Sequence, residues 1–217
     1  MKAYSIGLLA GALGLVTGCV ASEEQQEFQR GVEEPSGQDG PQFIQPYPEG
    51  PYGTGIGATI ANLEFIGWRT PDVAKYDPAL VERMQLGDYH DPKGTRGVKL
   101  IVINSSAVWC TACRAEAREI QNEGLFEKYL PQGVVFFWTL FEDNDENPAR
   151  FQDLVNWATL YEVNYPFVLD PGFKLRFFYD VDATPANIVV DAKTMTIEAE
   201  VSGYSPELWT KVDSLLQ

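Results

Sequence analysis

The feature that most constrains the fold of this chain is a strand-like run that leads into a pair of cysteines. Residues 98–103, Val-Lys-Leu-Ile-Val-Ile, are rich in branched apolar side chains, which is typical of a strand buried on both faces of a sheet. Cys110 and Cys113 follow within a few residues and open a segment with helical periodicity. A buried strand followed directly by a covering helix predicts an α/β fold around a central sheet.

The two cysteines stand at the expected N-terminus of that helix, separated by Thr111 and Ala112. Unpaired backbone N–H groups and the positive end of the helix dipole at this place favour thiolate over thiol. The spacing lets the second sulfur reach the first, so a mixed disulfide made by Cys110 can be resolved by Cys113. The pair therefore predicts dithiol–disulfide exchange, with the redox-active disulfide itself and no added cofactor.

Other uses of these residues are less favoured. A purely structural disulfide that closes so short a loop removes little chain entropy. A zinc site needs about four ligands, and the chain has three cysteines and one histidine, His90, which is expected in a polar turn. Asp143, Asp145 and Asn147 have the initial spacing of a calcium loop, but Pro148 replaces the required glycine. No metal site is therefore expected.

The N-terminal segment predicts export. Lys2 precedes an uncharged apolar stretch that is too short for a stable membrane span and has the layout of a secretory signal. It ends in Val-Thr-Gly-Cys at 16–19, which resembles the lipobox of bacterial lipoproteins, although an ordinary signal peptide with a chance cysteine is the alternative. Residues 1–18 are then the signal peptide, and lipid on Cys19 holds the protein at a membrane. This predicts a bacterial cell-envelope location on the exported, periplasmic side, with weak indications of the outer membrane.

Composition restricts the partners and the domain plan. The net charge is −15, and a chain this acidic is not expected to hold nucleic acid through phosphate contacts. Residues 19–57 are rich in Glu, Gln, Gly and Pro, which predicts a disordered, lipid-anchored tether. Apolar periodicity then continues to the C-terminus, so residues 58–217 are predicted to form one domain.

Within that domain the patterns predict alternating elements. The expected elements are an edge strand at 62–66, an irregular or partly helical stretch at 70–96, strands at 98–103 and 134–141, a helix capped by Asn147 and Pro148, a short strand or connector at 167–169, a helix at 173–179, a hairpin of 187–190 and 196–201, and a final helix from Ser205. This order gives a parallel βαβ unit followed by an antiparallel pair, with helices on both faces.

The Trp-Cys-x-x-Cys helix start, the later Thr184-Pro185 before a strand and the closing hairpin and helix resemble the thioredoxin fold. Within it, the chain resembles the TlpA-like branch of membrane-tethered, exported thiol-disulfide oxidoreductases. The resemblance covers about residues 58–217 and implies a three-layer α/β fold with a central mixed sheet. It also implies protein thiols or disulfides as substrates, an upstream redox partner and, usually, the reducing direction.

The same resemblance assigns roles to five residues. Cys110 is the nucleophile and Cys113 the buried resolving thiol, while Trp109 is the aromatic flank of the site. Pro185 matches the family's cis-proline, which faces the disulfide, and the backbone of Thr184 pairs with the bound substrate.

Three positions depart from the family pattern. Ala112 replaces the proline found before the second cysteine, which alters the redox poise in a direction that the sequence does not give. Asn104 stands where cytosolic thioredoxins carry a buried Asp that shuttles a proton. Glu116, one turn beyond Cys113, is a candidate substitute, although a solvated helix residue is the favoured interpretation.

Two other functions remain as alternatives. A thiol-dependent peroxidase of the peroxiredoxin group needs Thr or Ser three residues before its cysteine, where this chain has Ala107. A non-catalytic binding lipoprotein, such as a copper-delivery module, would use cysteines four apart together with a histidine. The leading hypothesis is an envelope thiol-disulfide oxidoreductase.

Overall fold

The computed structural model describes residues 46–71, 76–179 and 181–217. The predicted signal peptide at 1–18, the predicted lipidation site Cys19 and most of the predicted tether lie outside these ranges. Within them, no helix combines the length and the apolar character needed to cross a bilayer.

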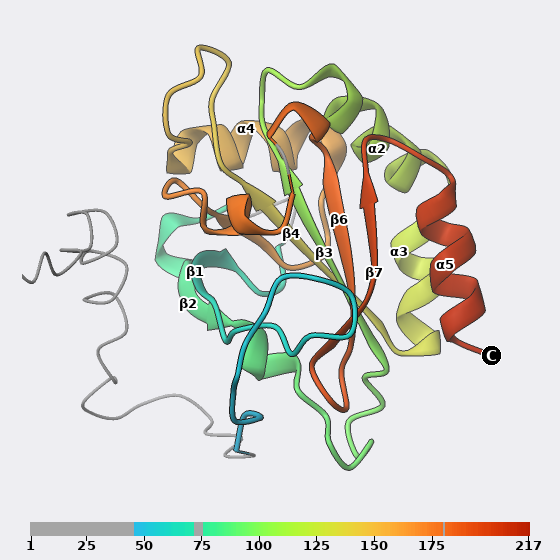
Figure 1. Ribbon diagram of the computed structural model, residues 1–217. Coiled ribbons are helices and arrows are strands. Elements are labelled where there is room, and N and C mark those ends of the chain that lie inside the picture. Colours follow the sequence, from blue (N-terminus) through green and yellow to red (C-terminus); the bar gives the residue numbers. More distant parts are fainter. Residues whose placement is uncertain (1–45, 72–75, 180) are drawn as a thin grey trace, which may run out of the picture. The chain divides into compact units, whose positions relative to one another are not determined.

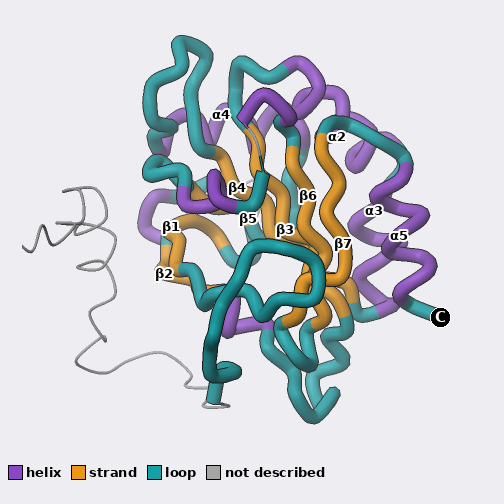
Figure 2. The backbone as a smooth tube through the Cα atoms, in the orientation of Figure 1, coloured by secondary structure: helices purple, strands orange, loops and turns teal. Residues whose placement is uncertain are grey.

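A seven-stranded mixed sheet forms the centre of the domain, in the order β2-β1-β5-β4-β3-β6-β7 (Figures 1 and 2). The strands are β1 (Glu64–Trp68), β2 (Glu82–Gln85), β3 (Leu100–Ser106), β4 (Val134–Leu140), β5 (Phe167–Leu169), β6 (Ala186–Asp191) and β7 (Thr196–Ser202). The three strands β3, β4 and β5 run parallel, and an antiparallel pair extends the sheet on each side. The predicted mixed sheet and closing hairpin are therefore confirmed.

Strand β3 lies at the centre of the core, as its branched side chains predict. All seven of its residues are buried, because β4 and β6 flank it and layers of chain cover both of its faces. Leu100 and Val102 enter one hydrophobic cluster, whereas Ile101 and Ile103 enter the cluster on the other face. Successive side chains of β3 therefore point to opposite faces of the sheet and anchor the strand to both hydrophobic clusters.

The two faces of the sheet are covered differently. The helices α2 (Thr111–Asn122), α3 (Leu125–Tyr129), α4 (Phe151–Tyr161) and α5 (Glu207–Leu215) all bury residues in the same cluster. The other face is covered by the 3-10 helices Leu86–Tyr89 and Lys174–Phe177 and by the chain around Ile60. The structure therefore has three layers, but one outer layer contains 3-10 helices and extended chain in place of α-helices.

Residues 46–57, which were predicted to belong to the tether, contact the domain that follows them. The Tyr47 hydroxyl donates to the carbonyl of Ile60 at 2.7 Å, and the Gly57 amide donates to the carbonyl of Ile197 at 2.8 Å. The ring of Tyr47 also packs at 5.8 Å from that of His90, which is buried and does not lie in an open polar loop. Aromatic and backbone contacts thus attach residues 46–57 to the domain, even though their composition resembles a tether.

Two predicted strand positions also differ. The strand expected at the edge near residues 62–66 is β1, which has neighbours on both sides. The edge strand is β2, in a stretch predicted to be irregular. Its sequence, Glu-Arg-Met-Gln, buries only Met84 and so lacks the apolar alternation that predicts a strand.

Local carboxylates explain two differences among the helices. Asp143 accepts the backbone N–H groups of Asp145 and Asn147 in a turn, so α4 begins only at Phe151 and not at Asn147. The helix expected at 173–179 is a single 3-10 turn, Lys174–Phe177, which starts where the buried Asp170 accepts two backbone N–H groups.

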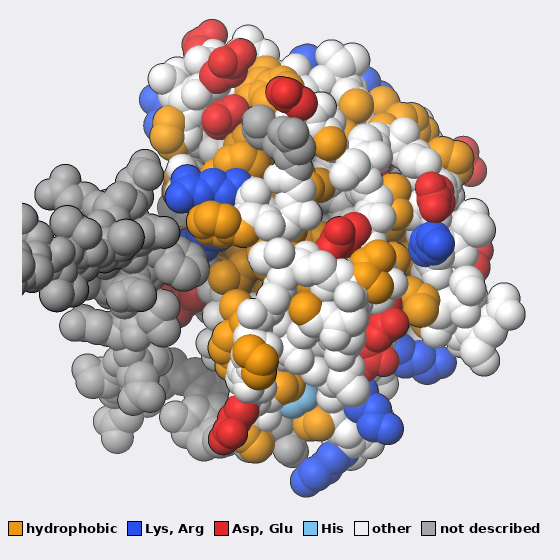
Figure 3. Space-filling view, viewed as in Figure 1, with side chains coloured by type: hydrophobic (Ala, Val, Ile, Leu, Met, Phe, Trp, Pro, Cys, Tyr) orange, Lys and Arg blue, Asp and Glu red, His pale blue; other side chains and the backbone are white. Residues whose placement is uncertain are grey.

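Charge is unevenly distributed on the face drawn in Figure 3. Acidic side chains gather over the loop between β4 and α4, whose sequence begins Phe-Glu-Asp-Asn-Asp-Glu at 141–146, whereas several Lys and Arg side chains lie at the opposite end of the domain. The acidic end is also the end at which β3 leads into α2.

Candidate active site

Cys110 and Cys113 lie at the start of α2, after the short connection from the end of β3. Cys110 is the N-cap of α2, and its Sγ accepts the backbone N–H of Cys113 at 3.0 Å. The two sulfurs are joined in a disulfide, and both residues are buried in the core cluster beside the sheet. An N–H group aimed at the Cys110 sulfur and the helix dipole behind it both favour negative charge there once the disulfide is reduced.

The segment before β6 forms the second wall of the site. The Thr184–Pro185 peptide bond is cis, and the carbonyl oxygen of Thr184 lies 3.6 Å from the Cys110 Sγ. The backbone N–H of Gly203 donates to the carbonyls of Ala183 and Pro185, at 2.9 and 2.7 Å, which holds this segment against the end of β7. The fold thereby places Thr184 next to the Cys110 sulfur, although the two residues are 74 positions apart in sequence.

Trp109 is fixed beside the disulfide by contacts from the loop after β4. Its Nε1 donates to the Glu142 carboxylate at 2.7 Å, and its ring meets the Phe141 ring edge to face at 6.4 Å. Arg114 donates to the Trp109 carbonyl at 2.9 Å. The carboxylate of Glu142 therefore orients the predicted aromatic flank, a role that no local spacing signal indicated.

Glu116 is buried, so its interpretation as a solvated helix residue is wrong. Only 1% of it is exposed, one turn of α2 beyond Cys113. Asn104 donates to its Oε2 at 2.7 Å and Asn187 donates to its Oε1 at 2.8 Å. Ser106 completes the network, because its hydroxyl donates to the side-chain oxygen Oδ1 of Asn104 at 2.6 Å.

Burial dominates the protonation of this carboxyl group. It raises the pKa of Glu116 to about 8, and the amide donors of Asn187 and Asn104 offset only part of that rise. Glu116 therefore gains and loses a proton near neutral pH. Side chains three residues apart on a helix are neighbours, so this proton-exchanging group lies close to Cys113.

The structure brings together the five residues predicted for the site: Trp109, Cys110, Cys113, Thr184 and Pro185. The predicted lipidation site, Cys19, lies outside the described residues. In the part of the chain that the structure describes, no group of three or more His, Cys, Asp or Glu residues is arranged to hold a metal ion.

Sequence reasoning missed Asn187. It pairs with Asn104 across the neighbouring strands β6 and β3 and donates to Glu116. An asparagine inside the apolar run of β6 was a usable signal, because a buried amide needs a partner.

Comparisons with known proteins agree with this geometry, although no family model matches the chain. The thiol-disulfide oxidoreductase ResA of Bacillus cereus is 24% identical over 152 residues, which cover 70% of this chain and 83% of ResA. The thiol:disulfide interchange protein DsbE of Allochromatium vinosum is 24% identical over 166 residues, covering 72% of this chain and 86% of DsbE.

Solved structures show the same fold. A protein from Chlorobium tepidum described as a thiol:disulfide interchange protein DsbE aligns with a TM-score of 0.56 at 15% identity, covering 76% of this chain and all of that one. A DsbF homologue from Corynebacterium diphtheriae aligns with a TM-score of 0.52 at 20% identity, covering 72% of this chain and 86% of the other.

Proposed function

Because this chain is a TlpA-like thiol-disulfide oxidoreductase of the thioredoxin fold, we propose that it reduces protein disulfides on the exported side of a bacterial cell envelope. The observation that carries the proposal is the Cys110–Cys113 disulfide at the start of α2, held against the Thr184–Pro185 segment. The Cys110 thiolate is the nucleophile, the backbone of Thr184 positions an extended substrate, and Trp109 forms the wall beside it.

The exchange proceeds in two balanced steps. The Cys110 thiolate attacks one sulfur of the substrate disulfide, the substrate S–S bond breaks, and the other substrate sulfur leaves and takes a proton. The Cys113 thiol then loses its proton and attacks the Cys110 sulfur, which expels the second substrate sulfur as a thiolate. Two electrons have passed to the substrate, and the Cys110–Cys113 disulfide has formed.

Glu116 is suited to move the proton of Cys113. Its ionised carboxylate accepts that proton before Cys113 attacks, and its protonated form returns it when the disulfide is reduced again. A pKa of about 8 lets the group serve both directions near neutral pH. Asn104 and Asn187 hold the carboxylate in place, because each donates to one of its oxygens.

The direction, the partner and the anchor belong to the proposal. The reducing direction rests on the resemblance to TlpA-like proteins, and a dithiol donor must return two electrons after each turnover. No cofactor other than the disulfide is required.

Lipid on Cys19 would keep the domain at the membrane. Cys19→Ser should abolish incorporation of labelled fatty acid without affecting exchange by the purified protein.

The test is thiol release from a peptide disulfide by the reduced full-length protein. Cys110→Ser should release none, whereas Cys113→Ser should stop after the first step and accumulate a mixed disulfide through Cys110. Substrate thiols released at the wild-type rate by Cys110→Ser would contradict the proposal.

A further inference from the structure

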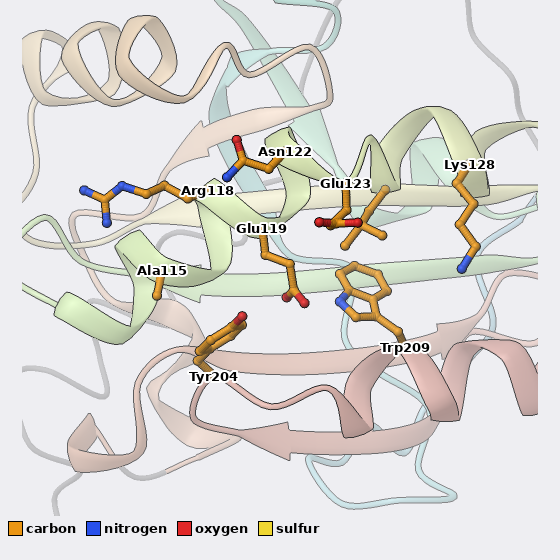
Figure 4. Close-up of a pocket in the computed structure, with 9 residues that line it drawn as sticks. Ala115, Arg118, Glu119, Asn122, Glu123, Lys128, Tyr204 and Trp209 are labelled. Carbon is orange, nitrogen blue, oxygen red and sulfur yellow. The ribbon is translucent and has the colours of Figure 1, made fainter.

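A groove lies beside α2, next to the turn that carries the buried Glu116. It has a volume of about 690 Å³ and is bordered by α2, α3, α5 and the chain between β7 and α5. Ala115 and Glu119 line it from α2, whereas Tyr204 and Trp209 line it from the C-terminal part of the chain (Figure 4). We call it the α2–α5 groove; its volume is within the range of sites that bind small molecules or single side chains.

The groove contains an acidic side chain, Glu119, that no basic side chain of the described residues neutralises. Glu119 forms no ion pair with any residue that the structure describes, and its buried Oε2 accepts no hydrogen bond from them. The two cations at the rim are engaged elsewhere. Arg118 lies 5.6 Å over the ring of Tyr161, and Lys128 lies 4.4 Å over the ring of Tyr129 and donates to its hydroxyl.

Two aromatic rings flank this carboxylate. Figure 4 shows the Glu119 carboxylate between the hydroxyl of Tyr204 and the indole of Trp209, with the Arg118 side chain directed away from it. Tyr204 also hydrogen-bonds to Glu119. A carboxylate that forms no ion pair and lies between aromatic rings is a favourable setting for an ammonium or guanidinium group, because ring faces attract cations and the carboxylate supplies the opposite charge.

The chain that borders the groove contacts the segment around Pro185 at the active site. Tyr204 follows Gly203, whose backbone N–H is bound by the carbonyls of Ala183 and Pro185. Glu119 lies nine residues beyond Cys110 along α2, which corresponds to roughly 14 Å at about 1.5 Å per helical residue. An extended peptide spans that distance with about four residues.

We propose that the α2–α5 groove binds a lysine or arginine side chain of the polypeptide substrate, placed about four residues from the cysteine that Cys110 attacks. The aliphatic part of that side chain packs on Trp209 and Tyr204, and its charged end pairs with Glu119. The groove thereby selects among polypeptide disulfides, while small disulfides that do not reach it react without selection. This inference rests on the proposed function.

The test compares two disulfide-linked peptides of identical composition with the reduced full-length protein. One carries its only lysine four residues from the cysteine, and the other carries it directly beside the cysteine. The first should react about fivefold faster, the size expected for a cation that pairs with a partly buried carboxylate between aromatic rings. Oxidised glutathione, which is too short to reach the groove, serves as the reference substrate.

Two variants separate the groove from the overall acidity of the protein. Glu119→Gln should remove the preference between the isomers and leave the rate with oxidised glutathione unchanged. Glu198→Gln removes one negative charge from an exposed position on β7 and should keep the preference. Thermal unfolding of both variants confirms that each is folded.

The possible results are distinguishable. Equal rates for the two isomers with the wild-type protein, or an equal loss of preference in Glu198→Gln, would overturn the inference and leave the proposed function intact. Absence of reaction with all three disulfides would overturn the proposed function, and the inference with it.

Discussion

Glu116 and Glu119 lie one turn apart on the same helix, yet their surroundings give them opposite properties. Glu116 faces the sheet, is fully buried, and accepts hydrogen bonds from two asparagine amides. Glu119 lines an open groove between aromatic rings. Burial makes the first carboxyl group a proton carrier near neutral pH, whereas the second is reachable by a ligand from the groove.

The largest expected effect is on the rate at which the mixed disulfide is resolved when Glu116 is replaced. Glu116→Gln removes the proton acceptor of Cys113, so resolution of the mixed disulfide should slow by about 100-fold, the usual size for a general base. The pH dependence of that step near pH 8 should also disappear. Rapid-quench alkylation of the mixed disulfide measures the step.

Glu119→Gln is the matched control, because it makes the same chemical change one turn along the helix. It should leave the resolution step within about twofold of the wild-type rate. A similar slowing in both variants would show that the burial of Glu116 has no special role.

The pH dependence of the free energy of unfolding should also differ between variants of Glu116 and Glu119. The folded state raises the pKa of Glu116 from 4.5 to about 8, so between these values the native protein holds a proton that the unfolded chain has lost. Stability from this group is therefore present below about pH 4.5 and is lost as the pH rises through 8. The loss should amount to about 4 kcal/mol, at about 1.4 kcal/mol per pH unit, and be absent in Glu116→Gln, as measured by denaturant unfolding from pH 5 to 9. Glu119→Gln should retain this loss of stability with rising pH, although its midpoint should move to slightly lower pH because Glu119 contributes to the raised pKa of Glu116.

Removing the amide donor of Asn187 should change the pKa of Glu116 further. Asn187→Ala withdraws a hydrogen bond that favours the ionised form of Glu116, so the pKa of Glu116 should rise above 8. Unfolding free energy at pH 9 should fall by about 2 kcal/mol, because the buried carboxylate then lacks one partner. The pH midpoint of mixed-disulfide resolution reports the pKa; an unchanged midpoint would contradict the network.

A third carboxyl group, that of the buried Asp170 directly after β5, should affect stability without changing exchange kinetics. Burial raises the pKa of Asp170 from 3.8 to about 6, although backbone N–H groups of Lys174 and Leu175 lower it. Wild-type stability should therefore fall by about 2 kcal/mol as the pH rises from 4 to 6.5. Asp170→Asn should abolish that fall without changing exchange kinetics; a thermal melt series across this range tests it.

The sequence predicted those parts of the molecule whose signals are local. The branched run of β3 and the two cysteines beside it are adjacent in the chain, so strand, helix start and disulfide all follow from one stretch. The hairpin of β6 and β7 was likewise visible, because the apolar side chains of β7 alternate with exposed ones.

The parts that were missed depend on contacts between distant segments. Burial of Glu116 requires Asn104 and Asn187, which are 83 residues apart and meet only through the pairing of β3 with β6. The attachment of Tyr47 to Ile60 and His90 is likewise tertiary and overrides a tether-like composition. In both cases the local sequence is typical of a helix surface or a polar linker, and the burial comes from a tertiary partner that the local sequence does not encode.

The most direct test of the central claim is a redox titration of the Cys110–Cys113 pair in the full-length protein, with the thiol state read by alkylation. We expect one reversible two-electron transition with a midpoint near that of thioredoxin, about −270 mV, as a reductant of protein disulfides requires. A midpoint near about −120 mV would contradict the reducing direction, and the absence of any reversible disulfide would contradict thiol-disulfide exchange itself.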